Sequence, residues 1–215
     1  MNKITISVVA ASLVLVAGCR WMGIRGNGNI KTDERTISAF ANIDASGAFT
    51  IEWQNGAPAL RITTDENLLP YIDNHISGDT LRLRTHEQIW PTHGIKVVIS
   101  SPTRAGAKLS GAVKLIANQI AGPKFAVEST GAARVTLDGS IDELLADMTG
   151  ASDLKASGLQ TKTSEISTTG AADAEVAVAE TLKVAITGAG KVTYSGNPKT
   201  IEKHITGAGS IRHRD

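Results

Sequence analysis

The sequence of 215 residues contains a single cysteine, Cys19. No disulfide can form within the chain, and no second cysteine is present to share in a zinc site. Aromatic residues make up only 4% of the chain, so the core must consist mainly of Val, Ile, Leu and Ala. The same scarcity argues against a long groove lined with sugar-stacking rings.

The chain also lacks an excess of charge of one sign. It has 22 Lys and Arg against 21 Asp and Glu, which gives a formal net charge of +1, and no long run of one sign occurs. This balance argues against nucleic acid as a partner and against a polybasic membrane-binding patch. A hydrophobic content of 41% is ordinary for a soluble globular protein.

The longest apolar run covers residues 4–17 and follows Lys3. It is shorter than the roughly 20 residues that span a bilayer, so we interpret residues 1–18 as a signal peptide. The run ends in Leu15-Val-Ala-Gly-Cys19, which resembles the bacterial lipobox, in which the cysteine becomes the first residue and carries a diacylglycerol. Residues 19–28 would then be the lipidated cysteine and a glycine-rich tether. The alternative is an ordinary secretory peptide with a spare thiol.

The residue after the cysteine is Arg20 rather than the aspartate that usually signals retention in the inner membrane. We therefore expect a protein of the bacterial cell envelope that is lipid-anchored to the outer membrane.

A tripeptide Ser/Thr-Gly-Ala recurs along the second half of the chain, at steps of 18 to 20 residues. Its glycines are Gly111, Gly131, Gly150, Gly170, Gly188 and Gly207. Residues two and four positions before each glycine are mostly apolar, the period of a buried strand, and a unit this short cannot hold two helices. The pattern predicts a right-handed parallel β-helix, or β-solenoid, of about 19-residue rungs over residues 105–211. We expect each box to form the corner of a rung, since glycine accepts positive φ.

Three residues after each glycine stands a second column, which is mostly charged: Lys114, Arg134, Asp153, Asp173, Lys191 and Ser210. If these side chains stack on the outside, Arg134 meets Asp153 and Asp173 meets Lys191. Residues 212–215 form a basic tail, and charge in the last rung is what an exposed solenoid end needs to avoid pairing with another molecule.

Residues 29–104 show alternation without the repeat and predict an N-terminal β part with antiparallel hairpins. One hairpin is expected to join residues 45–53 and 60–63 through Asn55-Gly56, and another to join 71–76 and 81–84 through Ser77-Gly-Asp79. A further strand is expected over 95–99. With the repeat region, this part would make a single all-β domain over 29–211.

Several pieces in this order resemble the bacterial head GIN domain family, which is described as the head of an auto-transporter adhesin and is counted among domains of unknown function. The pieces are Gly26-Asn-Gly-Asn-Ile30, Ser38-Ala-Phe-Ala-Asn-Ile43, Ser46-Gly47, Thr64-Asp-Glu-Asn-Leu-Leu69 and the Ser/Thr-Gly-Ala boxes. The resemblance covers about residues 25–211. It implies a β-solenoid-like domain on an exported or lipid-anchored protein, and it supplies no catalytic residues.

One segment of the sequence is a candidate binding site. The five histidines show no metal-ligand spacing, and neither GxSxG nor a phosphate-loop pattern occurs. Residues 86–93, with His86, Trp90 and His93, are interpreted as a binding loop; the alternative is a polar connection with a Trp at the domain edge. We expect no catalytic residue, metal or cofactor.

The favoured function is therefore a non-enzymatic envelope lipoprotein that binds, adheres or has a structural role, with a glycan or an envelope protein as partner. The alternative is a carbohydrate-active β-helix enzyme, a lyase or hydrolase. Such an enzyme needs carboxylates and a basic residue that converge on one face. Asp153 and Asp173, flanked by Arg134 and Lys191, form only a thin version of such a set, and calcium prefers six to eight oxygen ligands.

Overall fold

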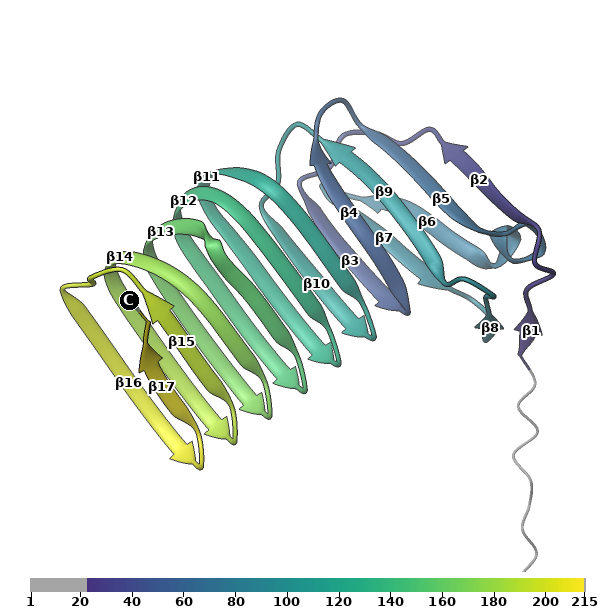
Figure 1. Cartoon of the computed structure of the whole chain (residues 1–215). Helices are drawn as coiled ribbons and strands as arrows, with labels where there is room; N and C mark the ends of the chain where they lie inside the picture. Colours follow the sequence, from purple (N-terminus) through teal and green to yellow (C-terminus); the bar gives the residue numbers. More distant parts are fainter. Residues whose placement is uncertain (1–22, 215) are drawn as a thin grey trace, which may run out of the picture.

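The computed structural model describes residues 23–214, and these form an elongated β-solenoid with antiparallel strands at its N-terminal end (Figure 1). The predicted all-β solenoid class is confirmed. Cys19 and the expected signal peptide lie outside the described residues. Among the residues described, no helix has the length and apolar character needed to cross a membrane.

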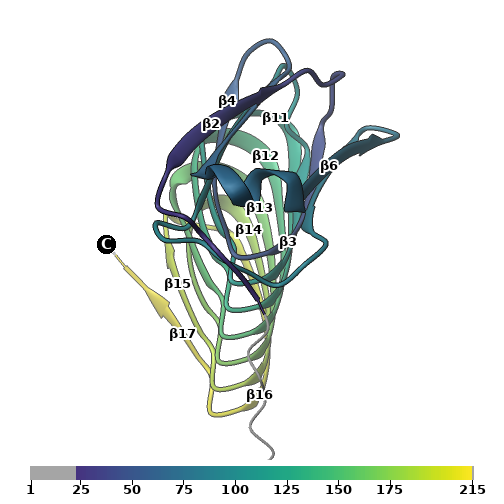
Figure 2. The same cartoon turned by 90° about the vertical axis from the view of Figure 1, so that its right-hand side faces the viewer.

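The repeat region consists of parallel strands, of which the long curved β11–β14 each extend from one glycine box to the next. Its strands are β10 (Gly106–Gly111), β11 (Lys114–Gly131), β12 (Arg134–Gly150), β13 (Asp153–Gly170), β14 (Asp173–Gly188), β15 (Lys191–Ser195), β16 (Thr200–Gly207) and β17 (Ser210–His213). Every neighbouring pair in this stack is parallel. Each rung bends sharply at the glycine box, and the turn at the other end of the rung is rounded, as the end view shows (Figure 2).

Each rung has two sides that meet at the box. The front side, nearer the viewer in Figure 1, contains β9, β4, the first halves of β11–β14, β15 and β17. The rear side contains β7, β3, β10, the second halves of β11–β14, and β16. We use these two names below.

Stacked glycines hold the corners together. The backbone at the box adopts positive φ, for example +112° at Gly131 and +109° at Gly150. A Cβ added to Gly150 would lie 2.5 Å from the carbonyl oxygen of Gly131, so only glycine allows this approach. The same carbonyl accepts a hydrogen bond from the N–H of Ala151 at 2.8 Å.

Alternate residues point inward and build one continuous core of Val, Ile, Leu and Ala. The few rings are concentrated near its N-terminal end, where the fully buried Trp53 lies 5.9 Å from Phe40 and 6.1 Å from Phe125, measured between ring centroids. The indole N–H of Trp53 donates to Ser101 Oγ at 2.8 Å. Burial of side chains this large contributes about 1.5–3 kcal/mol each.

The solenoid begins earlier than the sequence repeat indicated. Strands β3 (Asn42–Gly47) and β4 (Phe49–Asn55) form a rung whose corner is Ser46-Gly47-Ala48, in register with Ser110 and Gly111 of β10. This box has the same tripeptide as the others. The sequence-based prediction of a non-repeating N-terminal part did not include this box, because Gly47 lies 64 residues before Gly111, far outside the period of the repeat.

A further rung comes later in the sequence but lies outside β3 and β4 in space. Strands β7 (Thr80–Thr85) and β9 (Ile95–Ser101) run parallel to β3 and β4. The predicted hairpin through Asn55-Gly56 is therefore wrong: β9 lies between β4 and β5 (Ala59–Asp65), because β4 uses both of its edges for parallel partners. The second hairpin, β6 (Ile72–Ser77) with β7, is confirmed.

The N-terminal end of the solenoid is closed. Strands β5 and β2 (Ile30–Arg35) extend the front side with antiparallel pairing, and the short 3₁₀ helix η1 (Glu66–Tyr71) passes across the opening (Figure 2). Leu68 of η1 is fully buried. The Arg35 guanidinium fastens this cap by donating to the carbonyl oxygens of Ile72, at 2.6 Å, and Leu69, at 3.0 Å.

The C-terminal end is open by comparison. Among the described strands β16 pairs only with β14, and its core-facing residues Ile201 and Ile205 remain 43% and 38% exposed. Between them Lys203 occupies the position that Val184 fills in the rung before. The end strand therefore carries a charge at the centre of its core-facing row.

Candidate functional site

The rear side carries a straight row of hydroxyl groups along the edge where the boxes turn. Each residue pairs in register with the next, and the row consists of Ser46, Ser110, Thr130, Thr149, Thr169, Thr187 and Thr206. The two serines are half-buried and the threonines are exposed. Strand spacing places the hydroxyl groups about 4.8 Å apart, so the row offers a regular series of donors and acceptors to a ligand that extends along the solenoid.

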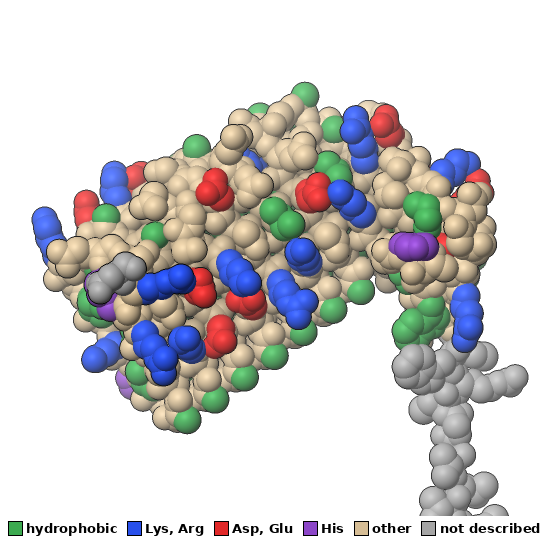
Figure 3. All heavy atoms as spheres, in the orientation of Figure 1, with side chains coloured by type: hydrophobic (Ala, Val, Ile, Leu, Met, Phe, Trp, Pro, Cys, Tyr) green, Lys and Arg blue, Asp and Glu red, His purple; other side chains and the backbone are tan. Residues whose placement is uncertain are grey.

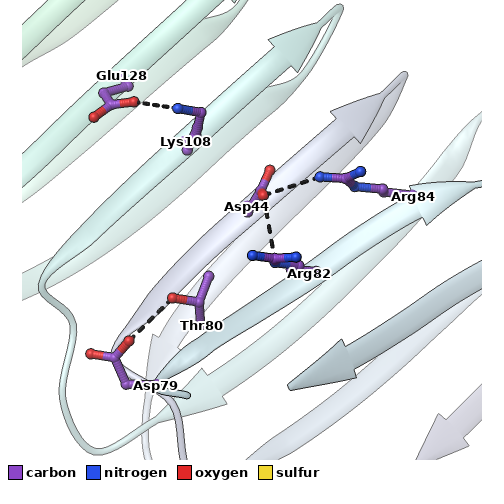
Figure 4. Close-up of polar contacts among 7 residues, drawn as sticks. All are labelled: Asp44, Asp79, Thr80, Arg82, Arg84, Lys108 and Glu128. Carbon is purple, nitrogen blue, oxygen red and sulfur yellow. Dashed lines mark hydrogen bonds and ion pairs between the residues drawn. The ribbon is translucent and has the colours of Figure 1, made fainter. Parts of the chain in front are cut away.

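Beside the hydroxyl row, ion pairs cluster at the N-terminal part of the rear side (Figure 4). The Asp44 carboxylate lies 3.3 Å from the guanidinium of Arg84 and 3.8 Å from that of Arg82. In the next two strands, Lys108 donates to Glu128 at 2.7 Å. We call these five residues the charge cluster.

The charge cluster borders an open hollow of about 300 Å³. Gly106 and Ala126 are among the residues that line it. The Asn42 side chain, which also lines it, donates to Asp79 Oδ2 at 3.0 Å. Amide, hydroxyl and charged side chains thus border the hollow, and this mixture suits a polar ligand.

Electrostatics stabilise the charge cluster as it stands. The hydrogen bond to Glu128 and its negative charge raise the pKa of Lys108, with a further contribution from Asp44. The Asp44 carboxylate is paired with Arg84 and Arg82, and the Glu128 carboxylate is paired with Lys108, so each carboxylate has neighbouring cations.

The front side carries the predicted charge column in register, from Lys114 to Ser210. Figure 3 shows Lys, Arg, Asp and Glu side chains gathered across this face, above a margin of small apolar groups. Asp153 forms its ion pair with Lys155 on the same strand, at 3.9 Å, and Asp173 accepts the backbone N–H of Lys191 at 3.1 Å. Exposed pairs of this kind contribute about 0–1 kcal/mol each and serve mainly to fix the register.

The expected binding loop, residues 86–93, lies where the outermost rung would have its glycine box. It joins β7 to β9 just as Gly47-Ala48 joins β3 to β4. Its predicted residues lie in different surroundings. His86 contacts Asp73 at 3.1 Å, and its ring is tilted against that of Tyr71 at 5.5 Å between centroids. Trp90 belongs to the short strand β8 (Ile89–Trp90), and His93 Nδ1 lies 3.0 Å from Thr92 Oγ1.

Asp65, which has no exposed surface, fixes this loop to the cap. Its carboxylate accepts the backbone N–H of Thr92 at 2.8 Å, the Thr92 hydroxyl at 2.8 Å and the backbone N–H of Gly28 at 2.7 Å. Burial alone would raise the pKa of Asp65, but the hydrogen bonds from Thr92 and Gly28 outweigh it and hold the pKa below its usual value. Sequence patterns do not predict this role of Asp65, because its partners Gly28 and Thr92 lie 37 and 27 residues away along the chain.

Within residues 23–214, no group of three or more His, Cys, Asp and Glu side chains is placed to hold a metal ion. The residues that sequence reasoning missed are those of the charge cluster. They come from segments far apart in the chain, and only the parallel pairing of β7 with β3 and of β3 with β10 brings them together.

The family described as "Putative auto-transporter adhesin, head GIN domain" matches residues 39–198. The chain belongs to the head GIN domain family. The match covers the solenoid from β3 to β15 together with β5 and η1 of the cap, and the resemblance expected from the Ser/Thr-Gly-Ala boxes is confirmed. No curated protein matches the chain.

Three solved structures of similar fold come from species of Bacteroides and Parabacteroides. A "putative adhesin" from Bacteroides fragilis has a TM-score of 0.74 at 22% identity and covers 89% of this chain and 100% of its own. A "putative adhesin" from Parabacteroides merdae has a TM-score of 0.55 at 22% identity, with 90% and 99% coverage. A "putative lipid binding protein" from Parabacteroides distasonis has a TM-score of 0.55 at 23% identity, with 89% and 99% coverage. At these identities the likeness shows the fold alone.

Proposed function

We propose that this protein is a non-enzymatic adhesion or binding module of the bacterial cell envelope, anchored to the outer membrane through a lipidated Cys19. The observation that carries the binding role is the hydroxyl row of the rear side, together with the charge cluster beside it. Membership in a family of adhesin heads supports the same role.

The partner that fits this surface is an extended polar polymer, for which a glycan is our first choice. Sugar hydroxyls exchange hydrogen bonds with Thr hydroxyls and with carboxylates, and a polymer can follow a row that repeats about every 4.8 Å. The charge cluster sets three cations, Arg82, Arg84 and Lys108, against two carboxylates, and most of its charge is neutralised within ion pairs. A ligand without strong charge therefore fits it better than a polyanion.

Binding of the protein to an array of bacterial and host glycans tests this proposal. The informative variant is Thr149→Val with Thr169→Val, which removes two adjacent exposed hydroxyls and keeps the side-chain shape. Each lost hydrogen bond is worth about 0.5–1.5 kcal/mol, so glycan binding should weaken roughly tenfold or more. The matched control, Thr136→Val with Thr193→Val on the front side, should bind as the original protein does.

If no glycan binds, or if the two double variants bind equally, the rear side is not the binding surface. The anchor is tested separately by mass spectrometry of the protein from its native membrane. We expect a diacylglyceryl group on Cys19 and its loss in Cys19→Ser, and an unmodified wild-type cysteine would refute the anchor.

A further inference from the structure

A second surface, at the capped end, has a different chemistry from the rear side. Strand β1 (Ile24–Arg25) runs parallel to β8, so that Ile24 pairs with Ile89 and Arg25 with Trp90. Backbone hydrogen bonds of 2.9 Å from Ile24 N–H to Gln88 and from Gly26 N–H to Trp90 hold this pair together. Arg25, Gly26, Trp90, Pro91 and Thr92 line an open hollow of about 460 Å³, which we call the N-terminal hollow.

Trp90 is placed unlike the buried tryptophan of the core. Trp53 is 1% exposed and sits among aromatic rings, whereas Trp90 is 37% exposed, and a Cβ added to Gly23 would meet its indole. The ring therefore lies over the first residue of the described chain, at the surface. Figure 3 shows apolar side chains at the surface of this end of the described domain.

The chain length outside the structure decides what can face this hollow. Cys19 precedes Ile24 by five residues. Because an extended chain spans at most about 3.6 Å per residue, the two residues can be no more than about 18 Å apart. A diacylglycerol on Cys19 would thus hold β1 and β8 against the lipid headgroups. A tether this short gives the bilayer a high effective concentration at Trp90, so even weak contacts form.

The side chains at the hollow suit the interface of a bilayer. A tryptophan presents an apolar ring with a polar N–H and prefers the headgroup region, and the exposed Arg25 beside it can meet phosphate groups. The exposed Glu87 in the same loop offsets the charge of Arg25, so that the contact does not require anionic lipid.

The structure points to a membrane-contacting surface: we propose that Trp90, Pro91 and Arg25 rest in the phospholipid headgroup layer and set the orientation of the anchored domain. This inference rests on the lipid anchor of the proposed function. Residues 86–94 would then have replaced the glycine box of the outermost rung with a membrane-facing loop.

The test uses the chain from Cys19 onward, which contains every described residue, and does not depend on acylation in the cell. The single cysteine, Cys19, is coupled to maleimide lipid in phosphatidylethanolamine–phosphatidylglycerol vesicles. The substitution Trp21→Phe leaves Trp53 and Trp90 as the two tryptophans whose fluorescence is measured. Acyl chains brominated near the headgroup quench a tryptophan that lies in the interface. We expect quenching in the Trp21→Phe protein, with a blue shift of its emission on coupling.

The control is the double variant Trp21→Phe, Trp90→Phe, in which only the buried Trp53 emits; it should show no quenching. Circular dichroism of the two proteins checks that both are folded. Equal emission from the Trp21→Phe protein in brominated and plain vesicles overturns the membrane-contacting surface. Quenching on coupled vesicles together with an unmodified Cys19 in cells would keep the surface and refute only the natural anchor.

Discussion

Substitution of a corner glycine by alanine should lower the free energy of unfolding by more than the backbone strain at positive φ alone, because the new side chain also crowds the neighbouring rung. In Gly150→Ala the new Cβ would lie 2.5 Å from the carbonyl oxygen of Gly131, whereas carbon and oxygen normally approach to about 3.3 Å. The two rungs must therefore move apart by several tenths of an ångström. That movement stretches the hydrogen bond from Ala151 N–H to the same carbonyl, now 2.8 Å long.

The magnitude follows from three contributions. A non-glycine residue at φ +109° costs about 1–3 kcal/mol, and a weakened corner hydrogen bond costs about 1 kcal/mol more. Alanine recovers about 0.4–1 kcal/mol by restricting the unfolded chain. We expect a net loss of about 2–3 kcal/mol in the free energy of unfolding.

The chain offers a matched control in Gly122. This glycine also has positive φ, +141°, but no atom lies within 4 Å of a Cβ built there. Gly122→Ala should therefore show the backbone strain alone, about 1–2 kcal/mol. Urea unfolding followed by circular dichroism compares the two variants. If both lose the same stability, close stacking of the corners contributes nothing and our account of the box is wrong.

Three other changes have clear expected results. Thr168 Oγ1 is buried and has no hydrogen-bond partner among the described residues, so Thr168→Val should raise the free energy of unfolding by about 1 kcal/mol in the same urea assay. The pKa of Asp65 is lowered in the folded state, so the ionised carboxylate stabilises the protein above the usual pKa near 3.8, and this stabilisation is lost as pH falls through the lower folded pKa. Asp65→Asn should therefore remove part of the acid-induced loss of stability in a pH titration. An unchanged titration would contradict the role of Asp65. Lys203→Val should make β16 a continuous apolar edge and cause end-to-end association that grows with concentration in light scattering, whereas Lys203→Glu should behave as the wild type.

The solenoid was predictable because its repeat is local. From Gly111 onward each box lies 18 to 20 residues from the next, and each rung pairs with the rung just before it, so sequence spacing reports directly on spatial stacking. The core-facing positions followed from counting back from each glycine. Met148, Thr168 and Ile186 all lie inside as this count predicts.

The N-terminal part was less predictable because its pairings join distant segments. Asn55-Gly56 has the composition of a tight hairpin, but parallel pairing of β4 with β9 and β11 buries Ile51 and Trp53 on the core face and excludes it. The charge cluster shares this origin, since Arg82 reaches Asp44 only when β7 adds outside β3. A short-range pattern carries no information about such an order of strands.

The closed cap and the open last rung together make this chain a scaffold of adjustable length. The strands β7, β3, β10, β11, β12, β13, β14 and β16 follow one another on the rear side, and seven steps of about 4.8 Å give about 34 Å from end to end. Because β12 and β13 contact only equivalent neighbours, duplication or deletion of one whole repeat would change that length by one step and leave both ends intact. Evolution could thus alter how far a binding face extends from the cell without redesigning either the face or its attachment.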